Sequence, residues 1–405
     1  MTAQIAPDTL ALQLSLAVRL EQNGQWVAAA EMLESLSAEL DDVSRRCLVE
    51  ARLTDLYATV DRYSLAEEHM RRALELCHRD VGPAWLSAET AVSAGRLAIA
   101  TGDFATAQEL ARRCCLELRS WTPSSRDPRV GDALLGALNL ASLISIGRGD
   151  ARTTAALTSE ALALARRLQS PSPGALTDVR LYAVEAEILA GNTHRAEGGL
   201  WACYQFAIES GQTRDALSVA IFIAGYLRLT ARSDQSIGLL QPLAHAARKV
   251  GTGDVLGGFL IELGSAAADV RDTSLARKCL AELNSFAHVS PWISAHAYLL
   301  EARTEFADRR FDRSLAASEA AESSFIRIGR ERLVAPALQL QAESLAALDE
   351  TARAARTMRL AIERFEMIGQ HYPRRLVSAY LTMGSLTTDP AFNVKARRLR
   401  AELGS

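Results

Sequence analysis

The sequence predicts an all-α protein: an α–α superhelix of about ten helical hairpins that runs through residues 1–405 as a single repeat array. Two observations lead to this fold class. A short motif, a turn followed by the start of a helix, recurs about every 40 residues along the chain. Small side chains also recur at fixed distances from this motif, as close helix packing requires.

The recurring motif is clearest in the stretch GDFATA, residues 102–107. Aligning related stretches on their third residue gives ten anchor positions that are spaced by 37 to 47 residues. The anchors are Trp26, Tyr63, Phe104, Ala151, Thr193, Asp234, Thr273, Phe311, Thr351 and Pro390. Such a period is typical of a solenoid, in which each helical unit is buried only by its neighbours.

The residues around each anchor have predicted structural roles. Gly102 ends the first helix with a positive φ, and Asp103 caps the second helix. Ala107, three residues after the anchor, permits close approach of another helix. The position nine residues before the anchor is also small in most units, as at Gly95 and Gly264. Each unit is therefore expected to be a helix, a tight turn, a second helix and a variable connection.

This order of residues resembles the tetratricopeptide repeat (TPR), in which a small residue, Gly-Asp-Tyr and two alanines recur. The resemblance covers nearly the whole chain, although the period exceeds the usual ~34 residues. Several anchors, such as Ala151 and Asp234, are not aromatic. Longer units of this kind resemble those of bacterial regulators, including the maltose-activator class of signalling ATPases with LuxR-type effectors, and repeat modules fused to nucleotide cyclases. HEAT-like helical pairs, which have a similar period, are the structural alternative.

Two segments depart from the regular repeat. Residues 119–132 lie in the longest interval between anchors and contain two prolines and several turn-forming residues, which predicts a hinge or loop. The last unit, about residues 373–405, places Pro390, Asn393 and Arg400 where other units have small or apolar residues. We expect this unit to be a solvated terminal cap.

No catalytic motif stands out in the sequence. The seven histidines include no HExxH motif, and GxSxG and P-loop motifs are also lacking. We therefore expect no enzyme activity, no bound metal and no cofactor. The vicinal pair Cys114–Cys115 suggests either redox chemistry or core packing, and the small-residue position of Cys114 in its helix favours packing.

Charge and composition bear on partners and location. The net charge of −3 gives no overall attraction for nucleic acid, so direct nucleic-acid binding is not expected. The longest apolar run, residues 216–229, is too short to cross a bilayer and fits a buried helix, so no membrane partner is expected. Six scattered cysteines without metal-binding spacing indicate reduced thiols and a cytoplasmic location.

The resemblance to TPR proteins also implies a binding face, because the first helix of each unit lines the concave side of that superhelix. The positions expected to point inward are Arg52, Asp55, Arg96, Asn139, Tyr182, Glu185, Tyr226, Glu262, Arg303, Gln339 and Glu343. Mixed charges, amides and tyrosines suit an extended peptide, a protein segment or a small polar effector. A resemblance to peptide-pheromone receptors draws attention to Asn139. The alternative is that these residues simply hydrate the inner wall of the solenoid.

The sequence thus favours a non-catalytic regulatory or protein-interaction module of bacterial signal transduction or transcription regulation. Two alternatives are a static scaffold or assembly factor, and the sensor part of a larger enzyme, such as a nucleotide cyclase, whose effector domain lies outside this chain. A homodimer is also expected, because residues 10–20 carry leucines and a valine on more than one side of the first helix.

Overall fold

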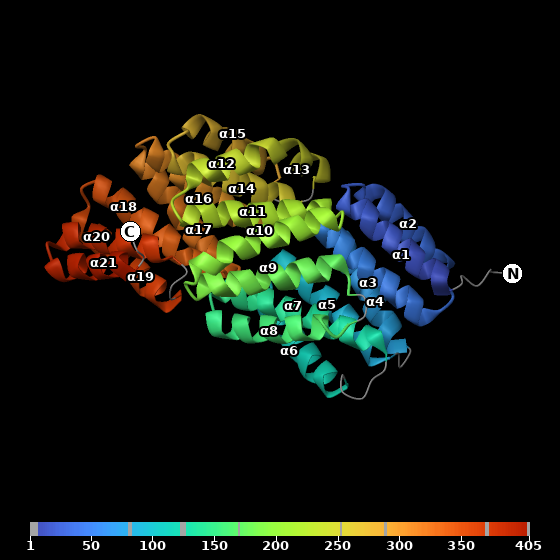
Figure 1. Cartoon of the computed structure of the whole chain (residues 1–405). Helices are drawn as coiled ribbons and strands as arrows, with labels where there is room; N and C mark the ends of the chain where they lie inside the picture. The colour runs from blue at the N-terminus through green and yellow to red at the C-terminus, as the bar shows by residue number, and fades with distance from the viewer. Residues whose placement is uncertain are drawn as a thin grey trace.

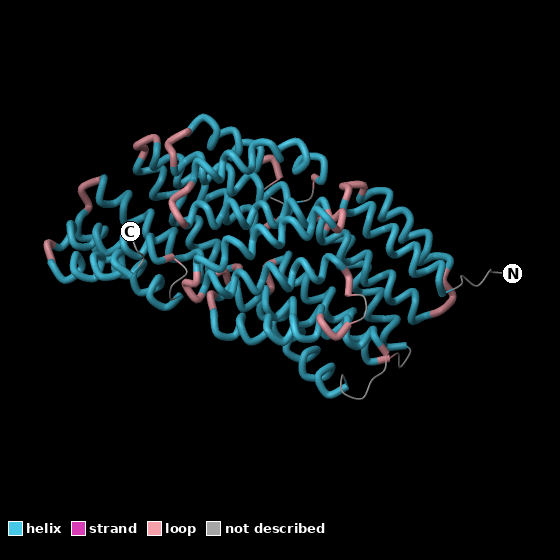
Figure 2. The backbone as a smooth tube through the Cα atoms, in the orientation of Figure 1, coloured by secondary structure: helices cyan, strands magenta, loops and turns pink. Residues whose placement is uncertain are grey.

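The chain folds into a series of antiparallel helices. In the view of Figure 1 the N-terminus lies at the right end of the molecule and the C-terminal helices lie at the left end. This computed structural model describes residues 7–79, 83–121, 127–168, 171–251, 253–286, 290–368 and 372–402. Within these ranges every regular element is a helix, and Figure 2 shows no strand. The prediction of an all-α superhelix is confirmed.

Ten hairpins follow one another along the chain. Their first helices are α1 (Pro7–Gln22), α3 (Val43–Thr59), α5 (Ala84–Thr101), α7 (Pro128–Arg148), α9 (Pro173–Leu189), α11 (Thr213–Leu229), α14 (Gly253–Asp269), α16 (Pro291–Ala307), α18 (Val334–Ala347) and α20 (Pro373–Thr387). Their second helices are α2 (Trp26–Glu39), α4 (Tyr63–Arg79), α6 (Phe104–Trp121), α8 (Ala151–Ala165), α10 (Thr193–Glu209), α12 (Ser233–Leu240), α15 (Thr273–Asn284), α17 (Phe311–Arg327), α19 (Thr351–Ile368) and α21 (Pro390–Glu402). The second helix of the sixth hairpin continues through η1 (Gln241–Leu243) into α13 (Ala244–Val250), and η2 (Glu331–Leu333) precedes α18.

The anchor residues mark the starts of the second helices. Nine of the ten second helices begin at the predicted anchor, and α12 begins one residue earlier, at Ser233. The turn before α6 has the predicted geometry: Gly102 has a φ of 90°, and the Asp103 side chain accepts a hydrogen bond from the Thr106 N–H at 3.1 Å. Ala107 is fully buried. The repeat is therefore set by turn chemistry and by the need for a small residue one turn later.

Small residues in the first helices let consecutive hairpins approach closely. A Cβ placed on Gly95 of α5 would lie 2.4 Å from Leu140 Cδ2 of α7. In the same way, a Cβ on Gly264 of α14 would lie 2.8 Å from Leu300 Cδ2 of α16. These distances are shorter than any normal contact, so larger residues at these positions would push neighbouring hairpins apart.

The hydrophobic core lies between the layers of first and second helices. Phe259, Phe325 and Phe365 are its largest fully buried side chains. Cys114 and Cys115 are buried in the same interlayer core, and burial raises the pKa of each thiol to about 11. Because a thiol of such high pKa is a weak nucleophile, their environment fits the packing interpretation better than redox chemistry.

The superhelix closes on itself after five hairpins. The turn between α1 and α2 lies against α13, because a Cβ on Gly24 would be 2.5 Å from the Lys249 carbonyl oxygen. The third hairpin meets the eighth, where Gly102 faces Ile328, and the fourth meets the ninth, where Gly149 faces Ile368. We call this set of contacts between hairpins five apart the seam; in Figure 1 the α1–α2 hairpin lies beside the ends of α11 and α13.

The two irregular segments of the sequence are only partly described. Helix α6 runs to Trp121 and α7 starts at Pro128, so residues 122–126 of the expected hinge lie outside the described residues. The expected cap begins where α20 begins, and its last three residues, 403–405, are also outside the described part. Within the cap, α20 buries Leu376, Tyr380 and Met383 in the last core cluster. The hinge and cap therefore stay predictions.

Two apolar helices occupy the interior of the array. Helix α7 is long and apolar enough to cross a membrane by length and composition, but 78% of its apolar window is buried inside the protein. Helix α11, which contains the apolar run of residues 216–229, buries Leu217, Val219 and Ile223. Both helices serve as packing elements of the fold.

The seam predicts a specific sensitivity to substitution at Gly24. Gly24 and Gly211 have similar φ values, 75° and 69°, but a Cβ on Gly211 would meet nothing within 4 Å. Both alanine variants should lose about 1 kcal/mol from the left-handed backbone conformation. Gly24→Ala should lose about 1–3 kcal/mol more, because its Cβ overlaps Lys249 O. Urea unfolding of the two variants measures this difference, and equal losses would show that the seam contributes nothing to stability.

Candidate functional site

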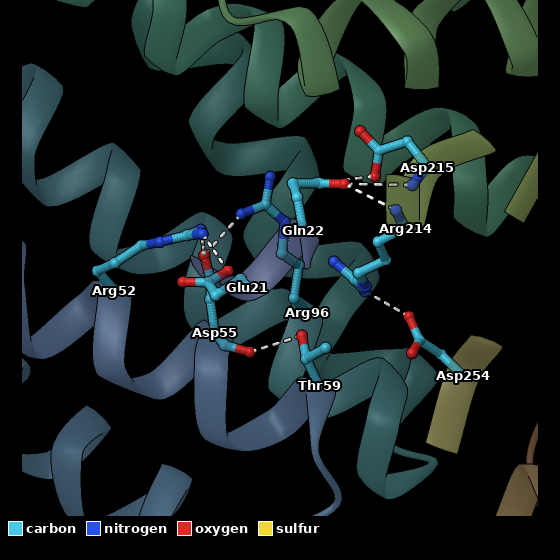
Figure 3. A network of polar contacts seen from close by, with 9 residues as sticks. All are labelled: Glu21, Gln22, Arg52, Asp55, Thr59, Arg96, Arg214, Asp215 and Asp254. Atoms are coloured by element: carbon cyan, nitrogen blue, oxygen red, sulfur yellow. Dashed lines mark hydrogen bonds and ion pairs between the residues drawn. The ribbon is translucent and has the colours of Figure 1, made fainter. Parts of the chain in front are cut away.

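Gln22, the last residue of α1, joins the first and sixth hairpins. Its amide Nε2 donates to Asp215 Oδ1 at 3.1 Å, and its Oε1 accepts from the Arg214 backbone N–H at 3.1 Å. The Arg214 side chain in turn pairs with Asp254 of α14. These residues form one polar network with their neighbours (Figure 3), which we call the N-terminal network; its members are Glu21, Gln22, Arg52, Asp55, Thr59, Arg96, Arg214, Asp215 and Asp254.

Three of the predicted site residues belong to this network. Arg52 pairs with Glu21, and Arg96 Nη1 donates to Asp55 Oδ2 at 2.8 Å. The pairs link α1, α3 and α5 along the inner face. Through these ion pairs Arg52, Asp55 and Arg96 tie consecutive hairpins together, although Arg52 Nε and Asp55 Oδ1 have no hydrogen-bond partner among the described residues.

The inner face of the N-terminal half carries several carboxyl groups of raised pKa, both within this network and beside it. Burial, followed by the charge of Asp215, raises the pKa of Asp178 in α9 to about 7. Burial also raises the pKa of Glu89 and of Asp215. The Asp178 residue itself is half-buried, but the surrounding protein encloses its carboxyl group on most sides. Carboxyl groups gathered in such a confined space resist ionisation.

Further along the chain the inner face becomes basic. Arg228 pairs with Glu262 at 2.6 Å and with Asp269 at 3.1 Å, and Arg332 of η2 lies 3.4 Å from Glu185 of α9. Arg330 stacks over the Phe104 ring at 4.6 Å from its centroid. Burial, followed by the charge of Arg332, lowers the pKa of Arg330 to about 9, so its positive charge is only weakly compensated.

His296 in α16 lies in the same basic environment. Burial, followed by the charges of Arg330 and Arg332, lowers the pKa of His296 to about 3. Its ring packs against Trp292 and Phe325, with centroids 5.0 and 5.1 Å away. His296 therefore stays neutral at physiological pH.

A cavity of about 520 Å³ opens at the turn-side edge of this basic region. Helices α14, α16, α18 and α20 contribute its walls together with the turns that follow α14 and α16. We call it the arginine cavity; its lining residues are Ala268, Asp269, Arg271, Arg303, Phe306, Ala307, Arg309, Phe311, Pro336, Gln339, Leu340, Glu343, Ala347 and Arg375. Its volume is in the range of small-ligand pockets.

Three more predicted residues meet in the arginine cavity. Arg303 Nη1 lies 3.8 Å from Asp269 Oδ1, and Gln339 Nε2 donates to Glu343 Oε1 at 2.8 Å. Burial, followed by the charges of Arg375 and Arg228, lowers the pKa of Arg303 to about 9. Burial also raises the pKa of Glu343. The cavity thus combines incompletely paired charges with an accessible volume.

The remaining predicted residues have different surroundings. Tyr182 faces the inner space between Asp178 and Arg330, and Glu185 and Glu262 are held in the ion pairs with Arg332 and Arg228. The structure places Asn139 and Tyr226 in the packed layer instead, each about 5% exposed. Asn139 Nδ2 donates to the Ala175 carbonyl oxygen at 3.2 Å, which ties α7 to α9. Neither residue lines the arginine cavity.

Several inner-face residues were missed by the sequence prediction. Asp178 lies one turn before Tyr182 on the same face of α9, so the helical period could have found it. Arg228 lies two residues after Tyr226 in α11, so the prediction missed it by a small error in helical phase. Arg375 belongs to the segment expected to be a solvated cap, and no local signal placed it in a cavity. Among the described residues, no group of three histidines, cysteines or carboxylates is positioned to hold a metal ion.

Comparisons with known proteins bear on the fold. No protein-family model and no curated protein matches the sequence. The chain is similar in structure to a Rap protein complexed with competence and sporulation factor, with a TM-score of 0.65 and 10% sequence identity over 90% of this chain and 99% of that one. The chain therefore has a TPR-like helical-repeat fold.

Two further solved structures align less closely. They are the apo form of RapI (TM-score 0.43, 10% identity, 97% of this chain and 98% of that one) and a signal transduction ATPase with numerous domains and a tetratricopeptide repeat sensor from Pyrococcus horikoshii. The latter has a TM-score of 0.42 and 14% identity over 92% of this chain and 64% of that one.

The raised pKa of Asp178 predicts how its replacement changes stability with pH. An unfolded aspartate has a pKa near 4 and folded Asp178 one of about 7, so the folded state loses stability as the pH rises between these values. Asp178→Asn removes this loss. Its melting temperature should equal that of the wild type near pH ~4 and exceed it near pH ~8.

Differential scanning calorimetry of the two proteins across this range measures the effect. Asp234→Asn, on an exposed position of α12, is the matched control and should show no such trend. A constant difference between Asp178→Asn and wild type at all pH values would contradict the prediction.

Proposed function

We propose that this chain is a non-catalytic regulatory module that binds a peptide or an extended protein segment on the inner face of its superhelix. The observation that carries this proposal is the arginine cavity, whose volume of about 520 Å³ lies among first helices and contains three of the predicted binding residues. The TPR-like fold supports an interaction role, because such solenoids present extended inner surfaces to their partners.

The charge distribution of the inner face favours an extended ligand over a compact one. Along α9 the surroundings change from acidic at Asp178 to basic at Glu185, which contacts Arg332. Seven helical residues span about 10 Å. A polypeptide segment with opposite charges at its two ends would match this change of sign over a length of a few residues.

The regulatory step would follow from the seam. A ligand on the inner face contacts hairpins that the seam also joins to hairpins five positions away, so its binding energy can shift the pitch of the whole superhelix. A role in bacterial signal transduction or transcription regulation is part of this proposal. The static scaffold and the sensor part of a larger enzyme, such as a nucleotide cyclase, are the alternatives.

Other features of the proposal concern location and partners. We propose a cytoplasmic protein without direct nucleic-acid or membrane contacts, and a small effector remains an alternative ligand. Homodimer formation through α1 also stays a prediction. Leu12 and Leu16 of this helix are 63% and 38% exposed and leave apolar surface for a second copy.

Peptide capture tests the proposed function. The full chain is incubated with a random library of peptides of about seven residues, and bound peptides are identified by mass spectrometry after gel filtration. The double variant Asp178→Asn/Arg303→Met should retain at least about tenfold less peptide, because it removes one acidic and one basic group from the inner face.

The control is Arg356→Met, on an exposed position of α19, which should retain as much peptide as the wild type. Equal retention by the double variant, with a melting temperature no lower than that of the wild type, would show that peptides bind elsewhere and would refute the inner-face proposal.

A further inference from the structure

We propose that the arginine cavity holds the C-terminal carboxylate of a peptide whose last side chain is apolar. This inference rests on the proposed function and assigns the end of the ligand that the cavity recognises. The support comes from the charges, the unpartnered polar atoms and the apolar wall of the cavity.

The first argument is charge. Four arginines, Arg271, Arg303, Arg309 and Arg375, line the cavity together with only two carboxylates, Asp269 and Glu343.

Both carboxylates already have partners. Asp269 accepts from Arg228 Nε at 3.1 Å, and Glu343 accepts from Gln339. Neither can fully balance the cavity arginines, so Arg303 keeps an incomplete counter-charge, in keeping with its lowered pKa of about 9. An anionic ligand group supplies the missing charge.

The second argument is hydrogen bonding. Arg303 Nη1 and Gln339 Oε1 are buried and have no hydrogen-bond partner among the described residues. The Gln339 side chain belongs to a residue only 4% exposed, and Arg375 makes no hydrogen bond or ion pair within the described part of the chain. Unsatisfied buried polar groups are costly, so these atoms call for a ligand.

The two vacant atoms differ in kind, and this difference defines the ligand. Arg303 Nη1 is a donor and needs an oxygen acceptor, whereas Gln339 Oε1 is an acceptor and needs an N–H or O–H donor. The last residue of a peptide presents both: a carboxylate and a backbone N–H, which are attached to the same Cα. A free phosphate at neutral pH offers acceptors in excess and meets the glutamine less well.

The third argument is the apolar wall. Phe306 and Phe311 pack edge to face with ring centroids 5.4 Å apart, and both line the cavity beside Leu340. This surface lies next to the arginines and suits an aliphatic or aromatic side chain. A small inorganic anion would leave it uncovered.

The test compares two peptide libraries that differ only at the C-terminal group. Both contain N-acetylated random peptides of about seven residues that end in an apolar residue; one carries a free carboxylate and the other a carboxamide. The wild-type chain should retain the free-acid library about ten- to a hundredfold better, the range expected for loss of a charged hydrogen-bonding group. N-acetyl-leucine should displace the bound peptides, and inorganic phosphate at the same concentration should not.

Arg303→Met should abolish the preference for the free acid, and Arg356→Met on α19 should keep it. Arg303→Met should not lower the melting temperature, because it removes an incompletely paired buried charge. If it does unfold the chain, Arg375→Met replaces it, since this arginine makes no ion pair within the described residues.

Each other outcome overturns the inference in a recognisable way. Equal retention of both libraries would leave peptide binding in place but remove the carboxylate from it. Displacement by phosphate as efficient as by N-acetyl-leucine would show that the cavity recognises the anion alone. Retention of neither library would refute the carboxylate assignment and the proposed function together.

Discussion

The closure of the superhelix after five hairpins is the constraint on which the inner face depends. At the seam, Gly24 meets Lys249 and Gly102 meets Ile328, so two successive turns of the superhelix are in direct contact. The first helices consequently face one another across a narrow interior. Charged side chains that would be well hydrated on an open solenoid are partly desolvated there, which is why the pKa of Asp178 rises and that of Arg303 falls.

Desolvation makes the pairing of each charge decisive. In the N-terminal network, Arg96 pairs with Asp55 and holds neighbouring hairpins together. In the arginine cavity, Asp269 is shared between Arg228 and Arg303, so one carboxylate serves two guanidinium groups. A buried charge without a full partner costs stability, whereas paired charges are nearly neutral in their effect. The N-terminal network thus joins hairpins through close ion pairs, whereas the arginine cavity divides one carboxylate between two arginines.

The sequence predicted local structure far better than the site. Anchor residues located the starts of the second helices because turn and capping chemistry acts over a few residues. The seam was not predictable, since the superhelical pitch sums small rotations over five hairpins. The site was missed for similar reasons. A small error in helical phase led to Tyr226, whereas Arg228 is the residue of α11 that faces inward. Arg375 reaches the cavity only because α20 packs on α18. Asn139 is buried in the packed layer, where its Nδ2 donates to the Ala175 carbonyl oxygen.

The shared carboxylate also connects the cavity to the rest of the array. Asp269 accepts from Arg228 of α11, and α11 forms the seam with α1 through Asp215 and Gln22. An anion bound to Arg303 would offset the repulsion between the Arg303 and Arg228 guanidinium groups, and so favour Arg228 in its pair with Asp269. In the proposed function, a ligand at the C-terminal hairpins would thereby be linked, through α14 and α11, to the contact that closes the superhelix at its N-terminal end.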